Sequence, residues 1–240
     1  MQRCDHHDWT SETYVDEWVR RQQAEDSRRG ERFQLICDLL PFPIDASVTI
    51  LDVGAGYGPL TAFILERYPH ATCIAQDGSE PMLQRARHLL AGYGPRFHAH
   101  QSDLFEAVWL PTLSSPVAAA VSSSCLHNLR DFRRISEIYH DIREHLQPGG
   151  VFLNFDLLNA PTPELQQRYT AVGEVRRQRE GATSGAVGAM VGRTDRTAVG
   201  GVGPFPANLE QHLTALKVAG FTQVDCFWKD LQRALYGGYV

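Results

Sequence analysis

The sequence has no paired cysteines and no long hydrophobic run. Its five cysteines are scattered singly, without a C-x-x-C pair, so neither a zinc site nor a redox dithiol has the spacing it needs. No stretch approaches the ~20 consecutive apolar residues of a membrane span. Residues 1–18 are polar and acidic, where a signal peptide needs a basic start followed by an apolar segment. We therefore expect a cytoplasmic protein that holds no metal and does not enter a membrane.

An excess of positive charge is also missing. The formal net charge is -5, which argues against a protein that binds nucleic acid through a broad basic surface. Two arginine-rich runs, at residues 28–32 and 176–180, contain glutamate and lie in expected helices, so we interpret them as solvated helix faces. Nucleic acid is therefore disfavoured as a partner.

The order of the remaining patterns predicts an α/β protein. With 240 residues, 43% of them hydrophobic, the chain can bury one sizeable core, so we expect a single domain. Residues 1–45 carry apolar side chains at helical spacing up to two prolines, which predicts a helical N-terminal cap. Strand-like runs then alternate with helical patterns, and strands separated by helices form a parallel sheet. The expected strands are residues 48–53, 71–76, 97–101, 117–121 and 151–155.

The last third of the chain departs from this alternation. Residues 157–206 combine a charged helical pattern with a run rich in glycine, alanine and threonine, and we interpret them as an inserted lid. A helix at 209–219 and two strands at 221–231 and 233–240 follow, and the short connection between these strands makes them antiparallel. The expected fold is a three-layer αβα sandwich whose seven-stranded sheet is mostly parallel, with an antiparallel last strand. Its parts are the cap (1–45), a core (46–156), the lid (157–206) and the final helix and strands (207–240).

A glycine-rich turn separates the first expected strand from the helix after it. Gly54, Gly56 and Gly58 let the backbone approach a ligand closely, and the amides at the start of the helix favour an anionic group. Asp77 ends the second strand roughly 20 residues on, where its carboxylate can accept hydrogen bonds from ribose hydroxyls. A dinucleotide fingerprint needs glycine at its sixth position, which is Pro59 here. The carboxylate therefore fits any adenosine-bearing ligand, and the missing sixth glycine disfavours NAD as that ligand.

Several motifs, in matching order, resemble those of class I S-adenosylmethionine-dependent methyltransferases. I-L-D-V-G-A-G-Y-G at 50–58 is similar to the first motif of that family, and D-G-S-E-P-M-L at 77–83 is similar to its second-strand motif. Further similar segments are the adenine-binding turn (101–104), the loop after the fourth strand (122–129) and the L-x-P-G-G turn before the fifth (146–152). The resemblance is strong over residues 46–156 and continues more weakly to the antiparallel final strands.

The resemblance implies a cofactor, a reaction and a set of residues. The cofactor would be S-adenosylmethionine, with S-adenosylhomocysteine as product, and the reaction an in-line transfer of the methyl group to an oxygen or nitrogen atom. Among the implied roles, Asp77 would hold the ribose, Asp103 the adenine amine, and Ser122 would line the methyl-donor end. The implied cofactor-binding residues are Asp52, Gly54, Ala55, Gly56, Asp77, Gly78, Met82, Asp103, Leu104 and Ser122.

Other residues are candidates for the acceptor side. His127 follows the fourth strand, where a carboxyl-end loop faces the ligand crevice, and its imidazole can take a proton from an acceptor hydroxyl. Methyl transfer from a sulfonium has no obligatory base. The alternative is therefore that this histidine only forms a hydrogen bond to the backbone. The expected substrate-side residues are Tyr14 and Trp18 on the N-terminal helix, with Asn154 and Asp156 at the end of the fifth strand.

Alternatives stay open at this point. Because the chain has no basic composition and no N-P-P-[YF] motif, we expect a small-molecule acceptor. A methyltransferase that acts on RNA or protein, or a module that binds the cofactor without turnover, is the alternative, and a nicotinamide-dependent oxidoreductase is disfavoured. For Met82, Tyr14 and Trp18 the alternative to ligand contact is ordinary packing in the core. For Asp103 the alternative is a role in a turn or a helix cap. The patterns do not identify the methyl acceptor. They do not give the oligomeric state either, and a homodimer is one of the open alternatives.

Overall fold

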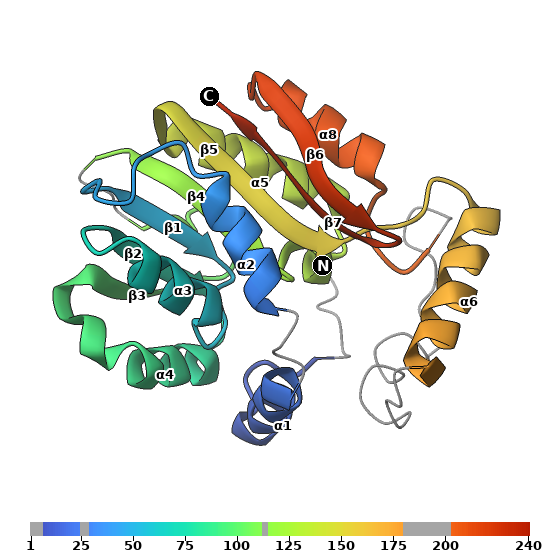
Figure 1. Ribbon diagram of the computed structural model, residues 1–240, viewed down its shortest axis with the longest axis horizontal. Coiled ribbons are helices and arrows are strands. Elements are labelled where there is room, and N and C mark those ends of the chain that lie inside the picture. The colour runs from blue at the N-terminus through green and yellow to red at the C-terminus, as the bar shows by residue number, and fades with distance from the viewer. Residues whose placement is uncertain (1–6, 25–28, 112–114, 180–202) are drawn as a thin grey trace.

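One seven-stranded sheet organises the parts of the chain that the computed structural model describes, residues 7–24, 29–111, 115–179 and 203–240. The strands are β1 (Thr49–Val53), β2 (Thr72–Asp77), β3 (Phe97–Gln101), β4 (Val117–Ser123), β5 (Leu146–Leu157), β6 (Gln223–Asp230) and β7 (Arg233–Tyr239). Their order across the sheet is β3-β2-β1-β4-β5-β7-β6 (Figure 1). Strand β7 runs antiparallel to its neighbours β5 and β6, and the other pairs are parallel. The predicted sheet is confirmed.

Helices cover both faces of the sheet and give three layers. They are α1 (Glu12–Ala24), α2 (Arg29–Asp38), α3 (Pro59–Arg67), α4 (Glu80–Leu89), α5 (Phe132–His145), α6 (Pro163–Arg179) and α8 (Leu209–Val218), with short 3-10 helices η2 (Ala91–Arg96) and η3 (Leu126–Leu129). Helices α2, α3 and α4 cover one face, and α5 and α8 cover the other (Figure 1). Successive strand residues point to opposite faces of the sheet. Ile50 therefore packs on the side of α2, α3 and α4, and Leu51 packs on the side of α5 and α8. Burial on both faces explains why β1 is apolar on both sides, at Ile50, Leu51 and Val53, with Asp52 as its one charged residue.

Side-chain caps determine where several helices begin. At the start of α4, Ser79 Oγ accepts the backbone N–H of Met82 at 3.2 Å. The side chain of Asp131 caps α5, and Asn208 and Gln211 form a reciprocal capping box at the start of α8. Each cap fixes a loop relative to the strand before it, so the loops at the carboxyl edge of the sheet have defined positions.

The fifth strand is longer than the sequence pattern predicts. Leu146 already pairs with Val117 of β4, and the register shifts before Ala119 pairs with Val151. The L-x-P-G-G turn is therefore an irregularity within β5, with Leu146 paired to β4 before it and Val151 paired after it. The apolar periodicity begins only at Val151, because residues 147–149 are exposed.

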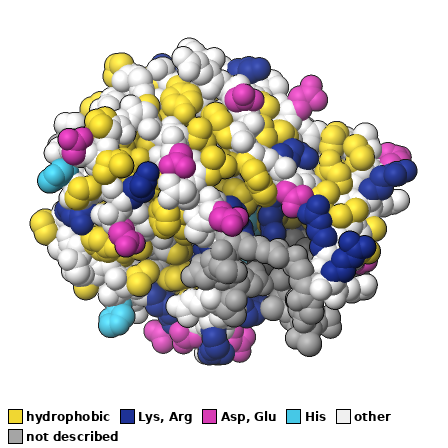
Figure 2. All heavy atoms as spheres, in the orientation of Figure 1, with side chains coloured by type: hydrophobic (Ala, Val, Ile, Leu, Met, Phe, Trp, Pro, Cys, Tyr) yellow, Lys and Arg dark blue, Asp and Glu magenta, His cyan; other side chains and the backbone are white. Residues whose placement is uncertain are grey.

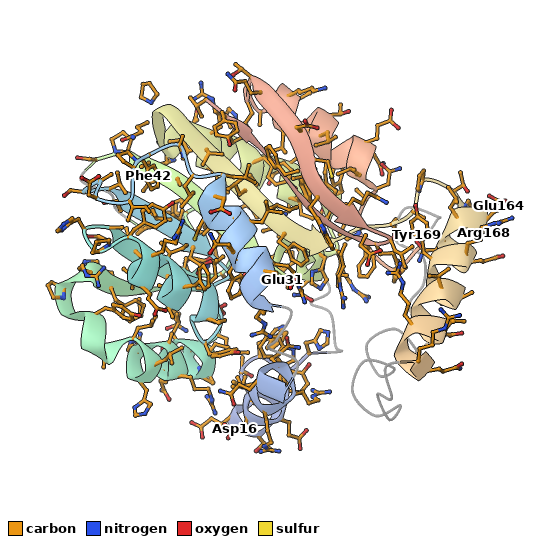
Figure 3. All side chains as sticks on the ribbon, viewed as in Figure 1. Asp16, Glu31, Phe42, Glu164, Arg168 and Tyr169 are labelled. Atoms are coloured by element: carbon orange, nitrogen blue, oxygen red, sulfur yellow. The ribbon has the colours of Figure 1, made fainter. Side chains whose placement is uncertain are left out.

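The predicted lid is described only in part, since residues 180–202 lie outside the described residues. Its helix α6 stands beside the β6–β7 hairpin, and Figure 3 shows Tyr169 on α6, whose hydroxyl is 3.4 Å from Lys229 Nζ. Arg176 is exposed and pairs with Asp230 at 2.7 Å, as a solvated helix face requires. Arginine and lysine side chains, in dark blue, lie at the right of Figure 2, where α6 is located. Among the described helices, none is long and apolar enough to cross a bilayer.

Candidate functional site

Hydrogen bonds join the glycine turn after β1 to the aspartate that ends β2. The two strands are neighbours in the sheet, so their carboxyl ends lie side by side. The backbone N–H of Gly56 donates to Asp77 Oδ2 at 2.8 Å, and that of Ser79 donates to Oδ1 at 2.8 Å. Gly56 has a φ of 57°, in the left-handed region that favours glycine. Burial raises the pKa of Asp77, and the bonds from the backbone amides oppose that rise.

Two further side chains brace the turn. Asp52 is buried and accepts the hydroxyl of Thr61 at 2.6 Å, and its burial raises its pKa to about 7. Gln76 accepts the backbone N–H of Gly54 at 3.1 Å and donates to the carbonyl of Ser102 at 2.7 Å. Gln76 was not among the predicted site residues, because its role appears only when the loops after β1 and β3 are placed beside it.

A cavity of about 830 Å³ opens at this turn. The predicted cofactor residues that line it are Asp52, Gly54, Ala55, Gly56, Asp77, Gly78, Met82, Asp103 and Leu104. Ser122 does not line it: the side chain is buried and its hydroxyl donates to the carbonyl of Val53 at 2.9 Å. The next residues, Ser123, Ser124 and Cys125, line the cavity in its place. The strand therefore turns Ser122 toward β1, and its neighbours line this part of the cavity.

Asp103 and Met82 also have the structural roles, in a turn and in packing, that were the alternatives to ligand binding. Asp103 accepts the backbone N–H of Phe105 at 2.9 Å, as a turn-forming aspartate does. Met82 is buried and packs with Val15 and Tyr57. Both side chains still border the cavity, so the local role and contact with a ligand are compatible at each position.

His127 and Asp156 form one buried pair. Imidazole Nδ1 is 2.6 Å from Asp156 Oδ1, and Asp156 Oδ2 accepts the backbone N–H of His127 at 3.0 Å. With the carboxylate as acceptor, Nδ1 carries the proton of the neutral ring and Nε2 keeps its lone pair. The ring meets that of Phe205 edge-on, with centroids 5.8 Å apart. Neither His127 nor Asp156 lines the cavity, whereas Cys125 and Asn128 of the same loop do.

Asn154 lies away from the cavity, in a buried polar network. Its Nδ2 donates to the hydroxyl of Tyr236 at 2.8 Å, and that hydroxyl is 3.1 Å from the hydroxyl of Tyr139. The Tyr139 hydroxyl is 2.6 Å from Nδ1 of His212. Burial lowers the pKa of His212 to about 4, so the ring is neutral and Nδ1 accepts from Tyr139. The structure thus places Asn154 under the α5–α8 face instead of at the predicted acceptor side.

The N-terminal cap contributes aromatic rings to the cavity. Trp18 lines it and meets the rings of Trp9 and Tyr57 edge-on, with centroids 5.4 Å and 6.3 Å apart. The indole N–H of Trp18 is buried and has no hydrogen-bond partner among the described residues. Tyr14, the other predicted residue of this helix, packs against Trp9 and does not line the cavity.

Two arginines that the sequence assigned to a solvated face line the cavity as well. Arg29 and Arg32 lie three apart on α2 and therefore share one side of the helix, whereas Glu31, labelled in Figure 3, is exposed. Arg29 donates to the hydroxyl of Tyr57 at 2.6 Å. The guanidinium of Arg32 lies 5.1 Å from the centre of the Phe155 ring. The solvated-face interpretation of residues 28–32 is wrong for these two side chains.

A helix adjoining the site is held to the core by an ion pair. Asp16 on α1, labelled in Figure 3, binds Arg85 on α4 at 2.5 Å. The cap is thus attached to the helix that follows Asp77. In the parts of the chain that the structure describes, no group of three or more metal-binding side chains occurs.

The core of the chain is similar to proteins of known function. Residues 50–150 match a family model described as a methyltransferase domain. Trans-aconitate 2-methyltransferase of Azoarcus sp. (strain BH72) is 34% identical over 122 residues, which cover 50% of this chain and 44% of that protein. Malonyl-[acyl-carrier protein] O-methyltransferase of Xylella fastidiosa (strain M23) is 34% identical over 104 residues, 43% of this chain and 33% of that protein. The chain thus spans less than half the length of these relatives.

Solved structures agree with this assignment at the level of the fold. Human N-acetylserotonin methyltransferase, in complex with S-adenosylmethionine, superposes with a TM-score of 0.63 at 18% identity, over 96% of this chain and 57% of that one. An O-methyltransferase of Nostoc punctiforme PCC 73102, described as putative, gives a TM-score of 0.62 at 17% identity, over 93% and 60% of the two chains. Residues 50–150 are therefore similar in sequence to methyltransferase domains, and the chain has the fold of the solved methyltransferases.

Proposed function

We propose that the chain is an S-adenosylmethionine-dependent methyltransferase that methylates an oxygen atom of a small molecule. The observation that carries this proposal is the joined pair of Gly56 and Asp77 at the base of a cavity of about 830 Å³. A buried carboxylate beside a glycine turn, at the ends of neighbouring parallel strands, suits the ribose of an adenosine ligand. Because the N-terminal helices and residues 46–156 border the same cavity, we propose that they work as a single domain.

The residues around the turn fit the cofactor. A Cβ added at Gly56 would meet only the sulfur of Met82, at 4.0 Å, so the backbone there borders open space. Asp77 would hold the ribose hydroxyls, and Asp103, across the loop after β3, would accept from the adenine amine. The carboxylates of this wall also suit a ligand that carries positive charge. When bound, S-adenosylmethionine supplies a methyl group on a positively charged sulfur.

The chain's own part in the reaction is to place the acceptor oxygen and to receive its proton. The strand order reverses between β1 and β4, so a reacting group is expected over the ends of β4 and β5. Nε2 of His127 would accept the proton of an acceptor hydroxyl while Asp156 holds Nδ1–H and stabilises the imidazolium. Phe205, packed against the ring, keeps water from it. A carboxylate acceptor is already ionised and needs only placement.

The names of the relatives indicate which acceptors to test first. Trans-aconitate and a malonyl thioester both carry carboxylate groups, and methylation of a carboxylate oxygen gives an ester. A small acid is therefore the first acceptor to test. An acid bound to a carrier protein is the second kind of acceptor to test.

The test is calorimetric titration with S-adenosylmethionine, S-adenosylhomocysteine and NAD. We expect saturable binding of the first two and none of NAD. Asp77→Ala should weaken binding about tenfold or more, because the ribose loses a charged acceptor. Asp45→Ala, a change at an exposed loop aspartate, is the matched control and should leave binding unchanged.

A second variant separates binding from folding. Asp77 also anchors Gly56 and Ser79, so its removal loosens both loops. Asp77→Asn keeps one acceptor oxygen, and thermal unfolding of each variant shows whether the loops are intact. Binding of NAD alone, or no binding of either sulfur ligand by the folded wild type, would overturn the proposed function.

A further inference from the structure

The N-terminal helix α1 packs beside the two loops that surround Asp77 and the glycine turn. Val15 is buried with Tyr57 and Met82, and Trp18 packs against this cluster. Tyr57 belongs to the glycine turn after β1, and Met82 lies in the first turn of α4, the helix that follows Asp77. Trp18 is therefore placed beside the loops after β1 and β2, which are the loops that would hold the cofactor.

Polar contacts keep α1 in this position. The hydroxyl of Ser79 donates to the carbonyl of Trp9 at 2.5 Å, just before the helix begins. The backbone N–H of the same serine donates to Asp77 Oδ1 at 2.8 Å, and an ion pair joins α1 to α4. The position of Trp18 is thus tied to the loop that carries Asp77.

The indole nitrogen of Trp18 lacks a hydrogen-bond acceptor. It is buried and has no partner among the described residues. An indole N–H can only donate, and a buried donor without an acceptor is costly. In the same part of the chain, the other buried side-chain atom without a partner is Asn154 Oδ1, whose amide lies in the network under α5 and α8. Because the Trp18 ring borders the cavity, a bound ligand can supply the missing acceptor.

The start of α3 favours a group of negative charge at this side of the cavity. Helix α3 begins at Pro59, directly after the glycine turn, and has no side-chain cap. Pro59 and Leu60, its first residues, line the cavity. Uncapped backbone amides at a helix N-terminus attract an anionic group. The turn residue Tyr57, whose ring centre is 6.3 Å from that of Trp18, connects this helix start to the indole.

The chemistry of S-adenosylmethionine indicates which of its groups fits there. Its ammonium group, ribose hydroxyls and adenine amine all donate hydrogen bonds, so they suit the carboxylates of the cavity wall. Its amino-acid carboxylate carries negative charge and only accepts. An indole N–H and a helix N-terminus are both partners for such a group.

We propose that the indole N–H of Trp18 donates to the amino-acid carboxylate of the bound cofactor. The inference rests on the proposed function and deepens it, since it assigns Trp18 to the cofactor instead of to the methyl acceptor. It also makes α1 a wall of the cofactor site, because the donor comes from this helix.

The experiment combines a change in the protein with a change in the ligand. S-adenosylhomocysteine and its decarboxylated analogue, which lacks only the carboxylate, are titrated calorimetrically into the wild type, Trp18→Phe and Trp228→Phe. Phenylalanine keeps an aromatic ring and removes the N–H. Trp228, at an exposed position on β6 and outside the cavity lining, is the matched control. We expect Trp18→Phe to weaken binding of S-adenosylhomocysteine about tenfold and that of the analogue less than about twofold, whereas Trp228→Phe should leave both unchanged.

A spectroscopic measurement on the wild type does not depend on how well the variant folds. The indole N–H proton of Trp18 should shift downfield in NMR spectra on saturation with S-adenosylhomocysteine, and not with the decarboxylated analogue. Equal weakening of both ligands by Trp18→Phe would show that the ring acts through packing and would overturn the inference. Unchanged binding of both ligands, or an indole proton that S-adenosylhomocysteine does not shift, would overturn it as well. Failure of the wild type to bind S-adenosylhomocysteine would overturn the proposed function, and the inference with it.

Discussion

Asp156 binds His127 with both of its carboxylate oxygens, at 2.6 Å from the imidazole Nδ1 and at 3.0 Å from the backbone nitrogen. One carboxylate therefore orients the ring and also fixes the loop that carries it. The two residues are 29 positions apart in the chain and meet because β4 and β5 are adjacent parallel strands. This geometry makes the role of His127 testable through its partner.

Asp156→Asn should separate proton transfer from placement. The amide presents a donor where one carboxylate oxygen accepted, so it disfavours the tautomer with the proton on Nδ1. With a hydroxyl acceptor we expect kcat to fall about 100-fold or more, and with a carboxylate acceptor less than about tenfold. Steady-state kinetics with both acceptor types measures this. Asp230→Asn is the control, and a fall in affinity for S-adenosylhomocysteine would show that Asp156 acts on the fold instead.

Alanine at Gly54 should cost more than alanine at Gly56. Both glycines are in the left-handed region, with φ of 67° and 57°, so both variants carry about 1 kcal/mol of backbone strain. A Cβ at Gly54 would also overlap the side chain of Cys125, whereas at Gly56 the nearest atom is 4.0 Å away. We expect losses of about 3 kcal/mol for Gly54→Ala and about 1 kcal/mol for Gly56→Ala in urea unfolding. Equal losses would contradict the packing against Cys125.

His212 should make the folded state less stable in acid. Its pKa is about 4 in the folded protein, below its ordinary 6.5, so between these values the unfolded chain binds more protons. Stability is therefore lost as pH falls from 6.5 toward 4, by about 3 kcal/mol at the low end. Asp52, with a pKa raised to about 7, has the opposite trend, so the effect is measured as a difference between proteins.

The variant for this measurement is His212→Asn. Its side-chain oxygen can accept from Tyr139, but it does not titrate. Urea unfolding of both proteins from pH 4 to pH 7 should show the stability of the wild type falling relative to that of the variant below pH 6.5. A constant difference across the range would mean that His212 binds its proton equally well in the folded and unfolded states, and that burial does not lower its pKa.

Asn159 should hold the two ends of the lid together. Its Nδ2 donates to the carbonyl of Phe205 at 2.6 Å, and its Oδ1 accepts the backbone N–H of Phe205 at 2.9 Å. Asn159→Ala leaves both buried backbone groups unpaired, so we expect a loss of about 2–4 kcal/mol and faster amide exchange at residues 203–207. Gln167→Ala, at an exposed position on α6, should change stability by less than about 0.5 kcal/mol. Unchanged exchange at Phe205 would rule out this clamp.

Local patterns were sufficient for the predicted sheet and for most of the cofactor wall. The strand runs, the glycine turn and Asp77 could be predicted because each depends on neighbours in sequence: a run of buried apolar residues, a left-handed turn, a carboxylate at a strand end. Strand ends follow local signals less closely, and β5 begins at Leu146 because a ladder with β4 extends it. Residues 180–202 of the predicted lid lie outside the described part of the chain.

The sequence by itself determined the α/β fold, the order of its elements and most of the predicted residues that line the cavity, because periodicity and turn chemistry act over a few residues. Only the tertiary structure decided which distant side chains meet. It paired His127 with Asp156, withdrew Asn154 and Ser122 from the cavity, and brought Arg32 to the end of β5. Such contacts depend on which face of a strand or helix a side chain occupies once the layers have packed, and local sequence does not contain that information.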